Sequence, residues 1–257
     1  MNLANQMIDF FYKMDTDAFD IFKYHKISHS GGYFPAFSKS VSDFAYNHII
    51  PTGDVSIQDA LRLAASEFDT LGRKHVACIT PIPLEYDFVD KKGLHLINTD
   101  AWMLFSGRIS RPYTHPLIEV CQVVKTNIIQ YLDVFNKGFC DHIYGKLEDG
   151  YKIMEERSFG NPYKLKKIAF VNANPAGSIS VMIKGKIGYI DAFAVVPEYR
   201  MGGETAKCLG SDVLYTCYKN GVEHIFIITA ADTSLERFYE MNGFRTEFYS
   251  RFYTWGE

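Results

Sequence analysis

The sequence predicts an α/β (α+β) protein in which a mixed, mostly antiparallel sheet is flanked by helices. Three apolar runs typical of strands follow one another at 166–171, 178–183 and 187–196. They are joined by Asn-Ala-Asn-Pro-Ala-Gly and by Lys-Gly-Lys, and links this short favour antiparallel hairpins. Apolar residues at helical spacing mark other segments, most clearly 57–71 and 203–219. With 257 residues, the chain is long enough for one large domain or two modest ones.

The region before residue 75 is predicted to be mostly helical, with its clearest helix at 57–71. Ser56 followed by Asp59 resembles a capping box at the start of that helix. The stretch 29–40 is rich in Gly, Ser and Pro and is predicted to be a loop. Farther along, the pattern predicts a strand at 75–80, a helix at 84–92 and a strand through 102–105.

A domain boundary is predicted between Arg108 and Pro116, a segment with two prolines and few apolar residues. It separates a smaller N-terminal α/β domain at 1–112 from a second domain at 113–257. In the second domain we expect, besides the three strands above, a strand at 118–124, helices at 128–135, 147–157 and 203–219, a strand at 224–229, a helix at 234–241 and strands on either side of Tyr249.

Composition and charge narrow the class of function. A net charge of −3 and a pI near 6.2 provide no positive field for a polyanion, so we expect no nucleic-acid partner. The N-terminal residues lack the pattern of a signal peptide, and no apolar run reaches the roughly eighteen residues of a spanning helix, so we expect no membrane association. Five cysteines without CxxC pairs suit free thiols in a cytoplasmic protein. His25 and His29 are four residues apart, but Lys26 stands where a zinc protease needs glutamate, so we predict no metal site.

The most informative stretch is 194–209, where a strand leads through a glycine-bearing turn into a helix. Such a turn aims several backbone N–H groups and the positive end of the helix dipole at one point, which makes an anion site. Arg200 and Lys207 add positive charge, and Gly202 and Gly203 let a ligand approach the backbone. A purely structural turn explains the stretch equally well when it is taken alone, and it matches neither the Walker pattern nor GxGxxG.

Two motifs together resemble the paired signatures of the GNAT superfamily of acyl-CoA-dependent N-acetyltransferases. Val196-Pro-Glu-Tyr-Arg-Met-Gly-Gly is similar to the family's pyrophosphate loop, Arg-x-x-Gly-x-Gly/Ala. Phe238-Tyr-Glu-Met-Asn-Gly-Phe244 is similar to the helix and strand that close the pantetheine cleft. The order of elements over 117–257 is similar as well. The resemblance implies the GNAT fold, acetyl-CoA (coenzyme A) as cofactor and transfer of an acetyl group to an amine.

The resemblance also implies which residues contact the cofactor. Those that would wrap the pyrophosphate, largely through main-chain amides, are Arg200, Met201, Gly202, Gly203, Glu204 and Thr205. Those that would align the pantetheine, and present an amide to the thioester carbonyl, are Phe193, Ala194 and Val195.

Two of the implied positions depart from the family's pattern. Thr205 replaces the usual Gly or Ala, so its side chain would either crowd the loop or offer a hydroxyl to a phosphate oxygen. Asp232 stands where many relatives have an Asn that contacts pantetheine.

The implied chemistry is attack of a neutral amine on a thioester. Tyr239 matches the family's usual general acid, and a phenol has a pKa suited to protonating a departing alkyl thiolate; a core tyrosine on an amphipathic helix is the alternative. Asp191, an acid in an apolar strand, is the candidate base or water-holder, unless it faces solvent or pairs locally. Glu155 and Glu156 would hold a cationic substrate or simply form a solvated helix face.

An internal similarity links the two halves of the chain. The stretch that begins at His75 and the stretch that begins at His224 share the order His, apolar run, Thr, breaker, helix, Gly, strand. A decayed duplication would leave this pattern, and chance similarity of two such units would leave it too. Because no Arg-x-x-Gly-x-Gly loop precedes His75, and Val89 lies where the tyrosine is needed, we expect a degenerate GNAT-like first half that only contributes to the acceptor pocket. The aromatic loop around His29, Tyr33, Phe34 and Phe37 is a candidate for that wall, and a loop that simply packs is the alternative.

The leading interpretation is an acetyltransferase that acts on a primary amine of a small molecule or peptide in a ternary complex, as a monomer or homodimer. A non-catalytic CoA-binding regulatory or structural protein is the alternative, prompted by Thr205 and Asp232. A different nucleotide-binding α/β protein that uses the turn at Gly203 is a third.

Overall fold

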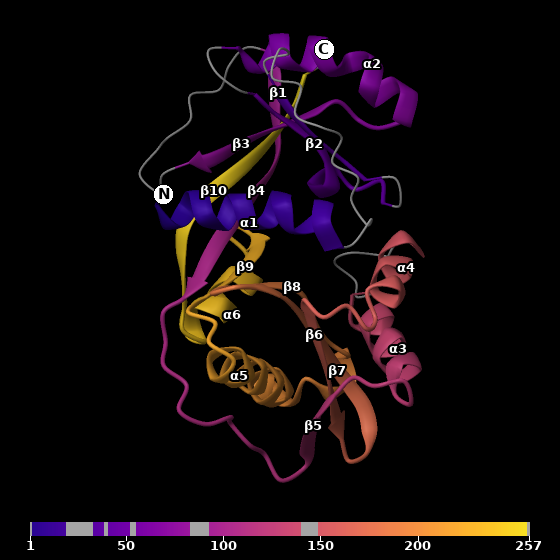
Figure 1. The fold of residues 1–257 in the computed structure, drawn as a ribbon, viewed down its shortest axis with the longest axis vertical. Coiled ribbons are helices and arrows are strands. Elements are labelled where there is room, and N and C mark those ends of the chain that lie inside the picture. Colours follow the sequence, from indigo (N-terminus) through magenta and orange to yellow (C-terminus); the bar gives the residue numbers. More distant parts are fainter. Residues whose placement is uncertain are drawn as a thin grey trace. The chain divides into compact units, whose positions relative to one another are not determined.

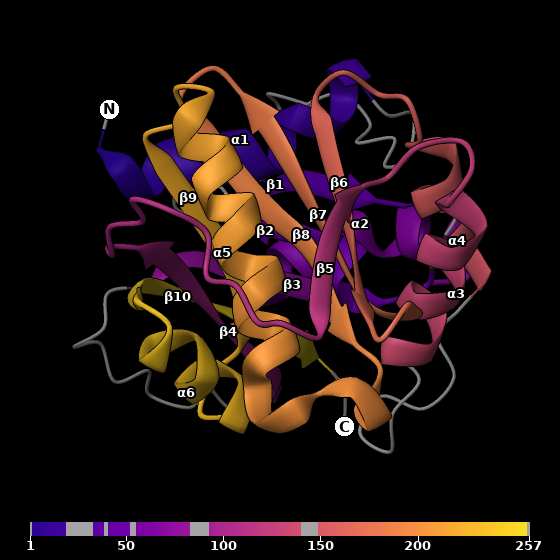
Figure 2. The same cartoon turned by 90° about the horizontal axis from the view of Figure 1, so that it is seen from below.

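The computed structural model describes residues 2–18, 33–38, 41–51, 55–82, 93–139 and 149–255. The chain divides into two compact units (Figures 1 and 2). Unit 1 comprises the described residues within Met1–Met103, Ile228–Met241 and Arg245–Glu257, and unit 2 comprises those within Leu104–Ile227 and Asn242–Phe244. No helix in the described part of the chain is long and apolar enough to cross a membrane.

Unit 1 is built from both ends of the chain. Its elements are α1 (Leu3–Ala18), β1 (Tyr33–Phe37), a short 3-10 turn (Phe44–Tyr46), β2 (Asn47–Pro51), α2 (Ile57–Leu71), β3 (Val76–Ile82), most of β4 (Leu94–Phe105), the end of β9 (His224–Ala230), α6 (Ser234–Met241) and nearly all of β10 (Phe244–Trp255). The strand order is β1-β2-β3-β10-β4, with β1–β2 and β3–β10 antiparallel and β2–β3 parallel.

The core of unit 1 lies under helix α2. The Ser56 side chain accepts a hydrogen bond from the Asp59 N–H at the helix start, as the capping pattern predicts. The apolar face of α2 packs with β1, β2 and the end of β10, in a cluster that includes Leu61, Phe68 and Tyr253. Helix α2 therefore covers one face of the N-terminal strands.

Two predictions for unit 1 were wrong. Tyr33–Phe37 lies inside the stretch predicted to be a loop, yet it forms strand β1 and pairs with β2. Pro35 is compatible with this because β1 is the edge strand, where a missing N–H costs no ladder hydrogen bond. The strands predicted on either side of Tyr249 are one strand, β10, whose register against β3 shifts between Tyr249 and Arg251. The helix predicted at 84–92 lies outside the described residues, as do His25, His29 and Cys140.

Unit 2 contains the described residues between Leu104 and Ile227, together with Asn242–Phe244. Its elements are β5 (Ile118–Gln122), α3 (Ile128–Phe139), α4 (Asp149–Arg157), β6 (Lys164–Val171), β7 (Asn174–Lys184), β8 (Ile187–Val195), two 3-10 turns (Pro197–Tyr199 and Met201–Gly203), α5 (Glu204–Lys219) and the first part of β9. The strand order is β9-β8-β7-β6-β5, in which β8–β9 is parallel and the other pairs are antiparallel. The predicted mostly antiparallel arrangement is confirmed.

Helices cover both faces of the unit 2 strands. Helix α5 lies across β5 to β8 on one face (Figure 2), where the Phe193 ring contacts Gly210. Helix α3 packs on β7 and β8 from the other face, and α4 packs beside it (Figure 1). A Cβ at Gly138 of α3 would lie only 2.7 Å from the Ala194 Cβ, so α3 approaches β8 too closely for any side chain there. Phe193 and Ala194 therefore point to opposite faces of β8.

The link between β6 and β7 is tighter than predicted. The six-residue connection is a two-residue turn, Asn172–Ala173, and β7 already begins at Asn174. Both turn residues have positive φ, 47° and 65°, which is the twist a two-residue hairpin turn requires. The Pro and Gly that signalled a loop belong to strand β7.

The compact units differ from the predicted division at Arg108–Pro116. The chain enters unit 2 inside β4, after Met103, and leaves it inside β9, after Ile227. The reason is strand pairing: β10 pairs with β3 along most of its length, so the C-terminal segments belong to the N-terminal unit. A proline-rich linker marks a boundary only where few contacts cross it, and strand pairs formed far apart in sequence are invisible to that criterion.

The two units repeat one order of elements. In unit 1, an antiparallel pair β1–β2 is followed by helix α2 and by β3, which pairs parallel to β2. In unit 2, the antiparallel pair β7–β8 is followed by α5 and by β9, which pairs parallel to β8. Gly93 and Gly243 then precede β4 and β10 with φ values of 84° and 88°. The shared order of elements extends beyond the two similar stretches that begin at His75 and at His224. A duplication predicts such a correspondence.

Candidate functional site

The turn between β8 and α5 has an uncommon backbone. Met201, Gly202 and Gly203 have φ values of 47°, 63° and 99°, three left-handed residues in succession. For Met201 this conformation costs about 1–2 kcal/mol relative to the right-handed one. A Cβ at Gly202 would meet nothing within 4 Å, so glycine is needed there for its φ rather than for space. The turn opens directly into α5, whose first N–H groups point out of the helix end.

The side chain of Thr205 serves the turn itself. It is fully buried, and its hydroxyl donates to the Tyr199 carbonyl at 2.5 Å. This contact ties the first turn of α5 to the preceding 3-10 turn. Two roles were expected for this side chain: to crowd the loop, or to offer its hydroxyl to a phosphate oxygen. The structure shows a different arrangement, in which the hydroxyl is engaged with the backbone inside the loop.

The charged side chains of the turn are held along its sides. Arg200 Nε donates to the Val195 carbonyl at 3.4 Å, which places the guanidinium group by the end of β8. Glu204 accepts a hydrogen bond from the Tyr113 hydroxyl at 2.6 Å and lies 3.0 Å from Lys207 Nζ. These donors lower the pKa of Glu204 below its ordinary value. Its carboxylate is thus paired with two donors. Two N–H groups of the turn are also engaged, because Gly203 N–H donates to the Arg200 carbonyl at 2.7 Å and Glu204 N–H donates to the Met201 carbonyl.

Strand β8 changes its neighbours just before the turn. Its parallel register with β9 runs from Ile187↔His224 to Ile190↔Ile227. The residues expected to align the cofactor, Phe193, Ala194 and Val195, come after the last of these pairs and keep their register with β7. A strand whose parallel pairing ends part-way along it gives an extended ligand an edge on which to lie.

A bulge sits at the same point of β8. Ser180 of β7 opposes Ala192, and Val181 opposes Ile190, so Asp191 is the extra residue. Asp191 Oδ1 accepts a hydrogen bond from the Ser180 hydroxyl at 2.7 Å, and Asp191 Oδ2 lies 2.5 Å from Lys164 Nζ. The acid predicted as a base therefore has a local ion-pair partner, as the alternative interpretation expected.

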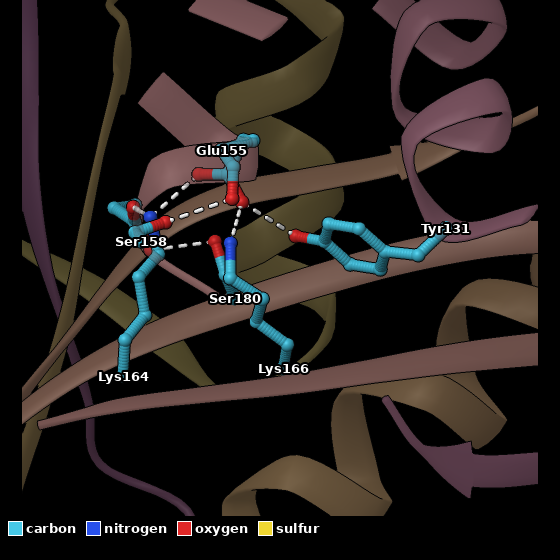
Figure 3. Close-up of polar contacts among 7 residues, drawn as sticks. Tyr131, Glu155, Ser158, Lys164, Lys166 and Ser180 are labelled. Carbon is cyan, nitrogen blue, oxygen red and sulfur yellow. Dashed lines mark hydrogen bonds and ion pairs between the residues drawn. The ribbon is translucent and has the colours of Figure 1, made fainter. Parts of the chain in front are cut away.

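Behind Asp191 lies a buried charged cluster, which we define as Tyr131, Glu155, Lys164, Lys166, Ser180 and Asp191. Lys164 Nζ is 2.5 Å from Glu155 Oε1, and Lys166 Nζ donates to Glu155 Oε2. The Tyr131 hydroxyl donates to the same Oε2 at 2.9 Å. Figure 3 shows the two lysines and the tyrosine converging on Glu155. The expectation that Glu155 and Glu156 form one solvated face is wrong for Glu155, which is buried, while Glu156 is exposed.

The ionisation of the cluster follows from its contacts. Burial favours the neutral form of Glu155, but the ammonium groups of Lys164 and Lys166 outweigh it and lower the pKa of Glu155 to about 2. Burial opposes the charge of Lys164 as well, yet Asp191 and Glu155 raise its pKa above the ordinary value. Burial together with the Lys164 charge lowers the pKa of Lys166 to about 8. Of the two lysines, Lys166 therefore has the pKa nearer to neutral pH.

Two predicted site residues, Asp232 and Tyr239, belong to unit 1. Asp232 has a φ of 59°, a conformation that Asn and Asp adopt more readily than other side chains, and its N–H donates to Glu236 Oε2 at 2.6 Å. This backbone requirement accounts for either residue at that position. Tyr239 is buried on α6, with its ring 5.5 Å from that of Phe238.

Sequence reasoning missed most of the charged cluster. Lys164 and Lys166 stand two apart on β6, a spacing that places both on one face of a strand. The sequence analysis assigned these two lysines no role. One sequence signal could have indicated the cluster. The two lysines could have been matched with two acids, Glu155 in a helix and Asp191 in an apolar strand. No group of three or more metal-ligating side chains that could hold a metal ion is found in the described part of the chain.

The fold is that of known acetyltransferase structures. A GCN5-related N-acetyltransferase from Kribbella flavida aligns over 100% of this chain and 97% of its own, with a TM-score of 0.70 and 11% identity. A GCN5-related N-acetyltransferase from Sphaerobacter thermophilus aligns over 86% and 75%, with a TM-score of 0.62 and 11% identity. A tandem GNAT protein from the clavulanic acid biosynthesis pathway aligns over 80% and 74%, with a TM-score of 0.52 and 12% identity.

These similarities establish the GNAT fold for this chain, as the resemblance implied. They extend over both units, so the N-terminal region is included in the likeness. No protein-family model matches the sequence, and no curated protein matches it.

Proposed function

We propose that the protein is an acetyl-CoA-dependent N-acetyltransferase that acylates a primary amine of a small molecule or peptide. The observation that carries the proposal is the turn Arg200–Thr205, where three successive left-handed residues open into α5 at the end of β8 in a GNAT fold. A turn of this kind, with its outer surface open at Gly202, suits a diphosphate bound by main-chain N–H groups.

Each predicted site residue then has a role in the proposal. The turn Arg200–Thr205 binds the diphosphate through the main-chain amides that it does not itself engage, and Phe193, Ala194 and Val195 align the pantetheine arm and direct an amide at the thioester carbonyl. Acetyl-CoA, when bound, supplies the activated acyl carbon. Asp191 receives a proton from the substrate ammonium, and Tyr239 protonates the departing thiolate; both roles rest on the motif resemblance and on ordinary pKa matching. Asp232 is proposed to contact the pantetheine.

A second candidate is a CoA-binding protein without turnover. The pairing of Asp191 with Lys164 favours it, because the ammonium group already occupies one oxygen of the carboxylate proposed to receive the substrate proton. The two candidates share the cofactor site and differ only in acyl transfer.

The decisive experiment is a thermal-shift titration with acetyl-CoA, with ATP and NAD as controls, followed by an assay for free thiol with a panel of amines. A ligand that binds only the folded state stabilises it by about 2.7 kcal/mol at a hundredfold excess over Kd. A saturable shift with acetyl-CoA alone and thiol release with one or more amines support the enzyme. A shift without thiol release supports the second candidate, and a folded protein that acetyl-CoA leaves unshifted contradicts both.

A further inference from the structure

The charged cluster forms one unbroken chain of contacts that ends at the candidate base. Asp191 contacts Lys164, Lys164 contacts Glu155, and Glu155 contacts Lys166. Each link joins a carboxylate oxygen to a lysine Nζ within hydrogen-bond distance, so acidic and basic groups alternate along the chain. Such an alternation is the arrangement through which a proton passes from group to group without a mobile carrier.

Among the four linked charged residues, all of which the structure describes, Asp191 is the most exposed to solvent. The side chains of Lys164, Lys166 and Glu155 are 3%, 4% and 5% exposed, whereas that of Asp191 is 15% exposed. Asp191 also lies two residues before Phe193, in the segment of β8 proposed to align the cofactor. A proton that arrives at Asp191 therefore meets the cluster at its contact with Lys164.

Stability alone does not account for this cluster. Burying an ion pair costs desolvation free energy that can exceed the attraction between the charges, and replacement by well-packed apolar side chains of similar volume is often neutral or stabilising. Here two lysines and two acids occupy a site between β6, β7, β8, α3 and α4 that apolar side chains could fill. The arrangement points to a use for the charges.

The two lysines are not equivalent. Lys164 lies between two carboxylates, Glu155 and Asp191. Lys166 shares one of them, Glu155, and its Nζ lies 5.0 Å from the centre of the Tyr131 ring. The groups that face Lys166 are thus Tyr131 on α3, Glu155 on α4, Lys164 on its own strand, Ser180 on β7 and Asp191 on β8. Lys166 has less compensation for its charge than Lys164, which agrees with the opposite directions of their pKa shifts.

We propose that Lys164, Glu155 and Lys166 form a proton relay behind Asp191, with the neutral amine of Lys166 as the final acceptor. This inference rests on the proposed function. The substrate ammonium gives a proton to Asp191, Lys164 takes that proton while giving one of its own to Glu155, and Glu155 passes it to Lys166. The shifts occur together, so no protonated Glu155 accumulates. The substrate becomes a neutral amine, the cluster changes its net charge from −1 to zero, and the proton returns to solvent by the reverse path after transfer.

The test compares the pH dependence of acetyl transfer in three variants with the wild type. Lys166→Met removes the acceptor. Lys166→Arg keeps the positive charge and the contact with Glu155 but does not release its proton, because the guanidinium pKa exceeds 12. Lys167→Met is the matched control: the neighbouring lysine lies on the other face of β6, where it pairs with Asp212 of α5. One amine serves in all assays at saturating concentration, so the titration of the substrate is common to them.

We expect the wild type and Lys167→Met to gain activity as pH rises through about 8, the pKa of Lys166. Lys166→Met and Lys166→Arg should lose this step and have a kcat near neutral pH lower by about tenfold or more. Acetyl-CoA binding, measured by thermal shift, should be unchanged in all. If Lys166→Met does not fold, Lys166→Arg carries the test, since it preserves the ion pair.

The outcomes separate the relay from the proposed function. An active wild type whose pH profile survives in both Lys166 variants overturns the relay and leaves the acetyltransferase intact. A uniform loss of activity at every pH, with the step near pH 8 retained, also overturns it, because that is the signature of a merely structural role. A wild type without acetyl transfer refutes the proposed function first, and the relay with it.

Discussion

Lys164 on β6 and Glu155 on α4 are joined by a contact of 2.5 Å in a site closed to solvent. Helix α4 packs beside α3, but the segment Asp149–Arg157 is mostly polar and offers few apolar side chains for that contact. The ion pair therefore fixes the helix that supplies one wall of the charged cluster, and the stability of that wall depends on pH.

Glu155→Gln should destabilise the protein by about 3–5 kcal/mol at neutral pH, because it leaves Lys164 and Lys166 with one carboxylate between them. The wild type should lose stability as pH falls from about 4.5 toward 2, since the pKa of Glu155 is lowered in the folded state and the unfolded chain binds the proton first. Glu155→Gln should lose less over this range. Chemical denaturation at several pH values measures both effects.

Glu156→Gln is the matched control, because this neighbouring acid on the same helix is exposed. It should change the free energy of unfolding by less than about 0.5 kcal/mol. An equal loss in the two variants would show that the buried ion pairs do not hold α4.

Gly202→Ala should weaken acetyl-CoA binding. Alanine at a φ of 63° is strained, and the turn would relieve the strain by moving the main-chain amides away from the diphosphate. Isothermal titration should show a Kd at least about tenfold higher, a change of about 1.4 kcal/mol. Gly185→Ala is the control: its φ is 59° and its Cβ would also meet open space, but it lies in the β7–β8 turn. Equal Kd values in both variants would exclude the Arg200–Thr205 turn from the cofactor site.

Thr205→Val should loosen the same turn without adding bulk. The variant leaves the Tyr199 carbonyl without its hydroxyl donor, which costs about 1 kcal/mol of stability, and the Kd for acetyl-CoA should rise by a few fold. Thr205→Ser retains the hydroxyl and should bind as the wild type does. Tighter binding by Thr205→Val would instead mean that the hydroxyl, and not the branched shape, hinders the cofactor.

Tyr239→Phe should reduce kcat by about a hundredfold while acetyl-CoA binding stays intact, because the variant removes only the proposed proton donor. Steady-state kinetics and thermal shift measure the two properties separately. Tyr253→Phe, another buried tyrosine of unit 1, controls for the loss of a hydroxyl in the core. A kcat that is unchanged in Tyr239→Phe would assign this residue to packing.

The elements that the sequence predicted best are those whose signals are local. Helix α6 begins and ends at the predicted residues, Ser234 and Met241, and the three strands of unit 2 lie close to the predicted ranges. Strand β1 was missed because it is defined by its pairing with β2, and no local sequence pattern predicts that pairing. The membership of the C-terminal segments in unit 1 was missed for the same reason. Apolar periodicity and turn residues predict the type and limits of an element, but they do not predict which strand it pairs with.

The residues of the candidate site likewise divide into those with a local sequence signal and those without one. The turn Arg200–Thr205 could be found because its residues are contiguous and glycine reports a backbone requirement directly. The charged cluster could not, because its members come from three strands and two helices, and each one alone resembles a solvated residue. A lysine that is buried beside a glutamate has the same sequence pattern as a lysine that faces water.

The place of β10 in the sheet also bears on how the protein is made. β3 ends at Ile82, yet the strand that pairs with it begins at Phe244. On the ribosome, β3 keeps an open strand edge until the residues of β10 have been synthesised, whereas unit 2 has its last residue, Phe244, before β10 is complete. Unit 1 thus receives its last strand after unit 2 is complete, although it contains the N-terminal residues, and an exposed β3 edge is the feature that a chaperone would need to shield during synthesis.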